Sequence, residues 1–161
     1  MPANFPMPAA EHLRDVLGDL MGRGVRVVPT RPADLGADRP GALADYETDR
    51  ERIGVVCVAD LRLTNALGAA LTMVAPNAVE DAVASQSIDQ PTIDNFREVV
   101  NVLTSVFNTI DTPHLKFKAV HRLPAMLPEP TKQLVDAPLG RRDFDVTIDD
   151  YGTGTLSVLL G

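Results

Sequence analysis

One stretch of the chain, PTIDNFREVVNVLTSVFN (residues 91–108), spaces its polar side chains in a way that could support chemistry. Wound as a helix at about 100° per residue, it brings short acidic, amide and hydroxyl side chains within roughly 40° of one line: Asp94, Glu98, Asn101, Ser105 and Asn108. Apolar side chains gather around the opposite line. The stretch therefore predicts an amphipathic helix whose polar row contains no lysine.

Two interpretations of this polar row are open. Most polar helix faces simply meet solvent, and they usually carry Lys and Glu at i,i+4 spacing. Asparagine is a mediocre helix former and contributes little when it is exposed. A row that carries asparagines in place of lysines indicates a face with a use beyond solvation.

Length and charge restrict the setting in which the row can act. The 161 residues, 45% of them hydrophobic, predict one domain over residues 1–161. A net charge of −7 argues against nucleic acid or an anionic membrane surface as the main partner, because both are negative. The N-terminus lacks a basic leader, and no run approaches the roughly 18 apolar residues of a membrane span. We therefore expect a cytoplasmic protein.

Hydrophobic periodicity predicts the elements that must position the helix. The segment from residue 31 to residue 50 is rich in Pro, Gly and Asp, and it predicts a long mobile loop. AALTMVAP (residues 69–76) is typical of a buried strand, although the overlapping LTNALGAALTM could also wind as a helical turn. The remaining patterns predict helices over residues 9–21 and 77–85 and strands over residues 25–30 and 53–61.

The C-terminal third alternates between apolar and polar residues and predicts a meander of strands. LKFKAVH, TKQLVDA, RRDFDVTID and GTLSVLL are separated by turn signals. Pro91 stands at the entrance of the long helix, with Thr92 or a neighbour as its N-cap. The fold class is therefore α+β, with helices packed against an antiparallel sheet.

An internal comparison indicates a duplicated unit. A shift of 83 positions lays residues 8–20 on residues 91–103, and Pro8, Arg14, Val16 and Leu20 meet identical residues. Each of the two helices is followed by about three strands, although two amphipathic helices can also match by chance. Gly18 stands where the second copy has Asn101.

The polar row also resembles the signature of a known family. Asp94, Glu98, Asn101 and Pro124 keep the spacing of the CheC/CheX/FliY phosphatases, which act on the phosphorylated chemotaxis response regulator CheY. The full spacing is expected by chance in roughly one chain in several hundred. The resemblance implies a duplicated helix-plus-strands unit in one antiparallel sheet. Single-site CheX-like members are the most similar, because Gly18 replaces the second Asn.

By this resemblance, Glu98 and Asn101 are the catalytic residues for an aspartyl phosphate on a CheY-type response regulator. Asn101 would orient the attacking water, since an amide donates and accepts hydrogen bonds and has no titrating proton. Glu98 would pair with the active-site lysine of the regulator, and Asp94 would contact the partner at the rim. Pro124 would hold the backbone at the entrance of a strand near the helix. The regulator would supply Mg²⁺, so the resemblance implies no cofactor bound by this chain itself. It also implies that the chain forms a homodimer.

Two positions depart from the family pattern. Many members have Gly where this chain has Arg97 and Ser105. Arg97 could alter how a regulator docks, or it could pair with an acidic group of that partner. The alternative function is therefore a non-catalytic binding module, like the middle domain of the flagellar switch protein FliM.

Other reactive residues favour structural interpretations. His12, His114 and His121 share no close spacing with Cys or carboxylates, so no metal site is predicted. Cys57 lies among apolar neighbours and is expected to be a buried strand residue. DFDVTIDDYG lacks the glycine that a calcium loop needs at the position of Ile148.

Overall fold

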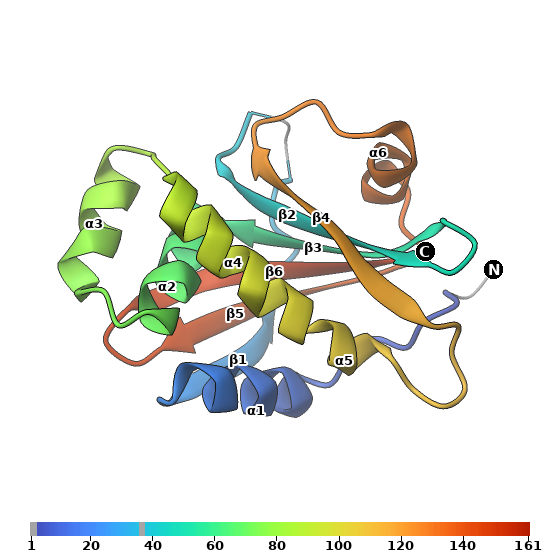
Figure 1. The fold of residues 1–161 in the computed structure, drawn as a ribbon, viewed down its shortest axis with the longest axis horizontal. Coiled ribbons are helices and arrows are strands. Elements are labelled where there is room, and N and C mark those ends of the chain that lie inside the picture. Colours follow the sequence, from blue (N-terminus) through green and yellow to red (C-terminus); the bar gives the residue numbers. More distant parts are fainter. Residues whose placement is uncertain (1–2, 36–37) are drawn as a thin grey trace.

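The computed structural model describes residues 3–35 and 38–161, and this part of the chain forms one six-stranded antiparallel sheet with helices on both faces (Figure 1). The strands are β1 (Val25–Thr30), β2 (Gly41–Thr48), β3 (Ile53–Asp60), β4 (Leu115–Leu123), β5 (Gly140–Ile148) and β6 (Gly152–Leu160). The helices are α1 (Ala10–Met21), α2 (Leu61–Leu71), α3 (Pro76–Ala84), α4 (Gln90–Val102), α5 (Thr104–Phe107) and α6 (Glu129–Asp136). The α+β class is confirmed.

The strand order shows the duplication directly. The sheet runs β1-β5-β6-β3-β2-β4, and exchanging β1 with β4, β2 with β5 and β3 with β6 gives the same order in reverse. The edge strands also pair in equivalent registers, because Val25 opposes Ile148 and Leu115 opposes Thr48. Two units, α1-β1-β2-β3 and α4-β4-β5-β6, therefore form the sheet around an axis between β3 and β6.

Helices α1, α2 and α4 cover one face of the sheet and enclose the main core. In Figure 1, α4 crosses this face obliquely and α1 lies below it. The other face carries a smaller apolar cluster, in which Leu134 of α6 packs against Leu43, Val56, Val58 and Leu159. The site helix α4 is thus backed along its length by the larger core.

Most of the predicted elements are present where the periodicity placed them. The first helix covers residues 10–21 and ends at Gly22, whose left-handed φ of 65° and N–H bond to Gly18 close the helix. The strands predicted around residues 25–30, 53–60 and 115–121 and the last two strands of the meander are all confirmed. Local burial patterns therefore predicted most of the elements of both units.

The predicted loop over residues 31–50 is wrong, because Gly41–Thr48 forms strand β2. This strand pairs with β3 on one side and with β4 on the other, and Gly41 to Tyr46 are all buried. A strand buried on both faces shows no alternation of polar and apolar residues, so its sequence resembles that of a loop. Residues 36 and 37 of the predicted loop lie outside the described residues.

One predicted strand is a helix, and for a second, AALTMVAP, the helical alternative over LTNALGAALTM is confirmed by α2. Residues 69–71 belong to α2, which is buried almost all round between the sheet and its neighbouring helices and so lacks an amphipathic pattern. TKQLVDA falls in α6, where Thr131 and Leu134 are buried three positions apart, as one face of a helix requires.

Among the described helices, none is both long and apolar enough to cross a membrane.

Candidate functional site on helix α4

Helix α4 begins with a conventional cap. The side chain of Asp89, and not Thr92, is the N-cap, because it accepts a 2.9 Å hydrogen bond from the Thr92 N–H. Hydrogen bonds from the Thr92 side chain and backbone hold the pKa of Asp89 below its usual value. Pro91 lies in the first turn, as predicted. The buried side of the helix packs into the main core through Ile93, Phe96, Val99 and Val100.

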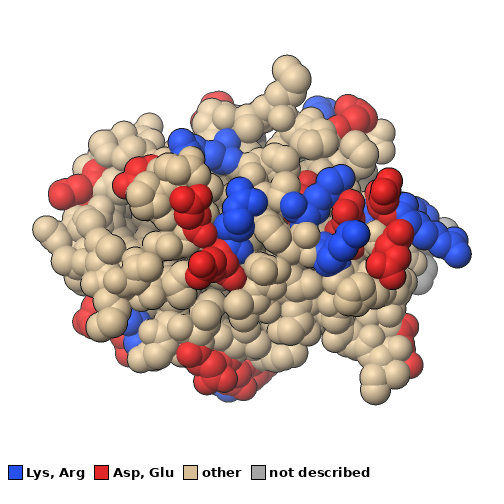
Figure 2. Space-filling model, viewed as in Figure 1, with Lys and Arg blue, Asp and Glu red and all other residues tan. Residues whose placement is uncertain are grey.

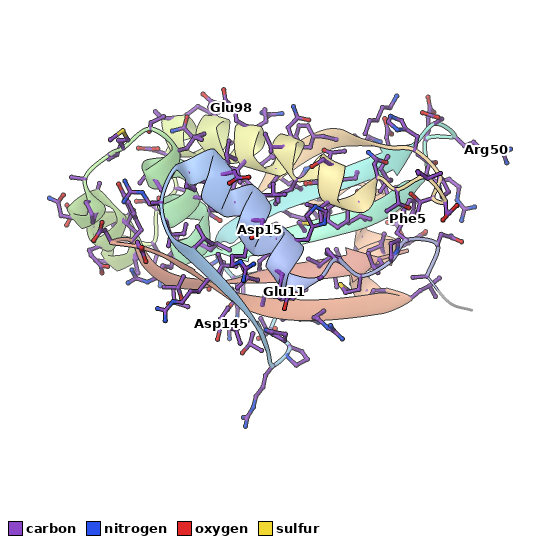
Figure 3. All side chains as sticks on the ribbon, turned by 90° about the horizontal axis from the view of Figure 1, so that it is seen from below. Phe5, Glu11, Asp15, Arg50, Glu98 and Asp145 are labelled. Carbon is purple, nitrogen blue, oxygen red and sulfur yellow. The ribbon has the colours of Figure 1, made fainter. Side chains whose placement is uncertain are left out.

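Glu98 and Asn101 lie one helical turn apart on the solvent side of α4, as the periodicity predicted. Figure 3 shows Glu98 projecting away from the sheet. Within the described part of the chain, neither side chain makes a hydrogen bond or an ion pair to another residue. A carboxylate and an amide are thus both available to a partner approaching this face.

Asp94 lies one turn before Glu98 and is linked to strand β4 by two successive hydrogen bonds. It accepts a 2.8 Å hydrogen bond from the amide of Gln90, and the amide oxygen of Gln90 accepts one of 3.1 Å from Arg122 of β4. Pro124 follows two positions after Arg122. The relay therefore links Asp94 to the end of β4 that precedes Pro124.

The strand position predicted for Pro124 is wrong. Pro124 is exposed and comes directly after Leu123, the last residue of β4, so it stands at the exit of the strand and not at its entrance. The peptide bond between these two residues is cis. Nothing in the geometry brings Pro124 against Glu98 or Asn101 directly.

Arg97 is exposed and leans toward the edge strand. Its guanidinium carbon lies 6.0 Å from the centre of the Phe117 ring, over β4. This distance is at the outer limit of a cation–π contact, and the pairing gives the side chain a resting position beside the site. A partner carboxylate could still reach the guanidinium, because the ring covers only one of its faces.

Asn108, the last residue of the predicted polar row, does not belong to the site. The helix breaks at Leu103, and the chain resumes as α5. Ser105 is exposed but bonds back to the Val102 carbonyl at 3.0 Å. Asn108 is half-buried and closes the connection to β4, with its amide bonded to both the N–H and the carbonyl of Leu115. The row available to a partner therefore ends near Ser105.

Residues outside α4 add no metal centre. In residues 3–35 and 38–161, no group of three or more His, Cys, Asp or Glu is placed to hold a metal ion. Cys57 is buried as predicted, and burial raises the pKa of its thiol to about 12. His121 lies on the edge strand β4, where its Nε2 is 3.1 Å from the buried carboxylate of Asp45, which also accepts a 2.7 Å bond from Thr131 of α6. Sequence analysis missed this cluster because Asp45 fell in the predicted loop.

A hollow of about 180 Å³ between α2, α3 and the start of α4 is lined by Pro91, Thr92 and Asn95, but not by Glu98 or Asn101. Another hollow of about 380 Å³ is lined by Asp60, Arg62 and Thr155 among others, and a more apolar one of about 320 Å³ lies between α6 and the sheet. Neither is lined by a residue of α4. The candidate site is an exposed helix face, which suits contact with a macromolecular surface better than enclosure of a small ligand.

Charged side chains gather around this face. Figure 2 shows positive and negative groups side by side over α4 and β4, on a surface that is otherwise largely uncharged. Lys116 and Lys118 of β4 share Glu47, at 3.8 and 3.4 Å. The site therefore presents both signs of charge in a protein whose overall charge is negative.

The fold and the exposed helix define a class of α+β domain built from two helix-plus-strands units. No protein-family model matches the chain, and no curated protein matches its sequence. The fold is similar to that of FliY from Thermotoga maritima, with a TM-score of 0.62 and 13% identity over 96% of this chain and 84% of that one. The FliM middle domain from H. pylori has a TM-score of 0.53 and 8% identity over 94% and 84% of the two chains. The resemblance to the CheC/CheX/FliY family is thus confirmed at the level of the fold.

Proposed function

We propose that the chain is a CheX-like phosphatase that hydrolyses the aspartyl phosphate of a chemotaxis-type response regulator. The observation that carries the proposal is the pair of exposed side chains on α4, Glu98 and Asn101, which are one turn apart and bound to no described residue. The FliY-like fold supports the same family, although fold similarity by itself does not establish an activity. A cytoplasmic location belongs to the proposal, because the phosphorylated regulator is a cytoplasmic protein.

The proposed reaction asks little of the chain. A water oxygen attacks the phosphorus in line, the bond from phosphorus to the aspartate oxygen breaks, and inorganic phosphate and the free carboxylate leave. The side-chain oxygen of Asn101 accepts a hydrogen bond from the water and so orients it, and no proton is transferred to or from the amide. The Mg²⁺ of such regulators belongs to the substrate protein and neutralises charge on the phosphoryl group.

Glu98 is assigned a binding role on the same face. Its carboxylate pairs with the active-site lysine of the regulator, and this pairing brings Asn101 into register with the phosphoryl group. Asp94 lies at the rim, where the relay from Arg122 through Gln90 orders its carboxylate before any partner arrives. Arg97 and Ser105 flank the pair as further contact positions, and Pro124 supports the strand exit behind Arg122.

The decisive experiment is dephosphorylation of a phosphorylated CheY-type receiver domain by the wild-type chain and by Asn101→Ala. Asn77→Ala is the matched control, because Asn77 is also an exposed asparagine on a helix, on α3 and away from the site. We expect rapid loss of the phosphoryl group with wild type and Asn77→Ala, and slow loss with Asn101→Ala. Equal rates for all three proteins would contradict the assignment of Asn101.

A non-catalytic switch module is the second candidate, and the FliM similarity favours it. One similar structure is a complex of FliM with SpeE from H. pylori, at a TM-score of 0.55 and 8% identity, so a domain similar to this chain is found in a protein complex. Arg97 and Ser105 stand where phosphatases often have glycine. Binding of a receiver domain without any acceleration of phosphoryl loss would select this function.

A homodimer is also proposed. In the described part of the chain, the edge strands β1 and β4 each pair with one neighbour only, and free strand edges readily pair with another chain. Sedimentation equilibrium at micromolar concentration should give twice the mass of the 161-residue chain. The monomer mass at all concentrations would contradict the dimer.

A further inference from the structure

Helix α4 is fixed at two places along its length. Near its start, the Asn95 amide donates to the Gly68 carbonyl at 3.0 Å and to the Thr72 hydroxyl at 3.2 Å, which ties the helix to α2. Near its end, the Tyr46 hydroxyl of β2 donates a 2.5 Å hydrogen bond to the Val100 carbonyl. Glu98 and Asn101 lie within two residues of Val100, so they are close to the second attachment.

Tyr46 is fully buried under the end of the helix. Its ring packs against Phe107 of α5 at 5.3 Å between ring centres and against Phe117 of β4 at 6.1 Å. Phe117 in turn lies beneath the guanidinium of Arg97. The tyrosine ring is therefore in contact with both α5 and β4 beside the last turn of α4.

The bonded carbonyl occupies a special position. The last four carbonyls of a helix have no partner within the helix, and Val100 is one of these because α4 ends at Val102. The Val100 carbonyl and the Asn101 N–H belong to one planar peptide group. A bond that holds this carbonyl therefore holds the backbone from which the Asn101 side chain projects.

The two-unit architecture provides an internal comparison. Thr48 and Ile148 occupy equivalent places at the ends of β2 and β5, so the counterpart of Tyr46 is Val146. Val146 is buried and has no hydroxyl to donate to α1. The tyrosine bond thus crosses from β2 of the first unit to α4 of the second, and the equivalent position Val146 in β5 cannot make the reciprocal bond to α1.

We infer that Tyr46 is a positioning residue of the site: its hydroxyl fixes the peptide between Val100 and Asn101 and so holds the Asn101 amide in place relative to Glu98. The catalytic part of this inference rests on the proposed phosphatase function. Burial raises the pKa of Tyr46 well above its ordinary value, so the hydroxyl remains a hydrogen-bond donor across the range of pH used in assays.

The test variant is Tyr46→Phe, which removes the hydroxyl and keeps the ring. Tyr151→Phe is the matched control, because the Tyr151 hydroxyl is also bonded to a backbone carbonyl, that of Val74, at 2.6 Å, and the residue is also buried. We expect kcat to fall about tenfold in Tyr46→Phe while KM changes less than twofold, since a small misplacement of a reacting group is costly and binding contacts remain. Tyr151→Phe should keep the wild-type kcat.

Amide hydrogen exchange supplies a readout that does not depend on activity. The backbone amides at the end of α4 should exchange faster in Tyr46→Phe than in wild type, and should be unchanged in Tyr151→Phe. If wild type dephosphorylates no receiver, the proposed function fails, and exchange alone then decides the inference: faster exchange supports the anchor and unchanged exchange overturns it. If wild type is active and depends on Asn101, a wild-type kcat in Tyr46→Phe overturns the positioning role.

A third measurement needs no variant and covers the case in which Tyr46→Phe does not fold. In wild type, the hydroxyl proton of Tyr46 should be visible by NMR as a resonance protected from exchange with water, because it is buried and bonded. A hydroxyl proton in rapid exchange with water would overturn the inference.

Discussion

Helices α1 and α4 occupy equivalent places in the two units, and their solvent faces differ. Figure 3 shows Glu11 and Asp15 on α1, which by the 83-residue shift correspond to Asp94 and Glu98. Asp15 is paired with its neighbour Arg14 at 3.0 Å, whereas Glu98 is bound to no described residue. Gly18 of α1 occupies the position that corresponds to Asn101 of α4. The same backbone unit is thus retained in both halves, while only the second half presents a carboxylate and an amide together.

The residues that pack beneath the two helices also differ. The end of α4 rests on the aromatic group of Tyr46, Phe107 and Phe117, and a hydroxyl bonds its last turn. The corresponding strand position beneath α1 is Val146. Duplication therefore supplies two similar helix supports, and the amide on α4 of the second unit is anchored by a tyrosine from β2 of the first unit.

The largest expected contrast is between Asn101→Ala and Gly18→Ala in the phosphatase assay. Loss of the amide should slow phosphoryl hydrolysis about 10²-fold, equivalent to about 2.7 kcal/mol of transition-state stabilisation. The change at Gly18 should leave the rate unchanged, because α1 carries no amide there. A comparable loss of rate in both variants would show that α1 takes part in the reaction.

The next largest effect is expected on stability, from a substitution where α4 packs on α2. A Cβ at Gly68 would lie 2.9 Å from Thr92 Cγ2 and 3.1 Å from the Thr92 carbonyl oxygen, so the two helices must move apart to accept it. We expect Gly68→Ala to lower the free energy of unfolding by about 1–3 kcal/mol. Urea unfolding with an unchanged m-value measures the effect, and an unshifted midpoint would mean that the helix contact is looser than described.

Glu98→Ala and Asp15→Ala compare the two carboxylates. Removal of the Glu98 carboxylate should weaken binding of a receiver domain about tenfold, or about 1.4 kcal/mol, because an ion pair across the interface is lost. Asp15→Ala should bind as wild type does, since Asp15 is already paired with Arg14. Titration calorimetry gives both dissociation constants, and equal affinities for the two variants would contradict the role of Glu98.

The smallest effect is expected at Gly18 itself. Its position is helical, and an added Cβ would meet the Arg23 carbonyl oxygen at 3.7 Å, an ordinary contact. Gly18→Ala should therefore stabilise the protein by about 0.5–1 kcal/mol, because alanine loses less conformational freedom on folding. A lower midpoint of thermal unfolding in the variant would show that α1 needs a glycine for a reason other than its missing amide.

Much of the fold could be predicted because burial leaves a periodic pattern in half-buried elements. Helix α1 has one buried and one exposed face, and from Phe144 to Ile148 buried residues of β5 alternate with half-buried ones. The pattern failed where both faces are covered, as in β2 and α2, and where an inserted helix, α6, was short enough to be mistaken for a strand. The elements that were missed include the strand that carries Tyr46.

The candidate site was predictable in part for the same reason. Glu98 and Asn101 lie on the exposed face of a strongly amphipathic helix, and local spacing determines that face. The place of Asn108 was not predictable, since it bonds to Leu115 only because the chain turns there. Nor was the link from Asp94 through Gln90 to Arg122, which joins two elements that are distant in the sequence.

The sequence by itself determined which side chains α4 presents to solvent, because a helix assigns its faces through contacts between residues only three or four positions apart. The tertiary structure alone decided what holds that helix in place. Tyr46 and Val100 are 54 positions apart, and their bond forms only after β2 has entered the sheet between β3 and β4. Strand order depends on the pairing of distant segments, which no local pattern encodes.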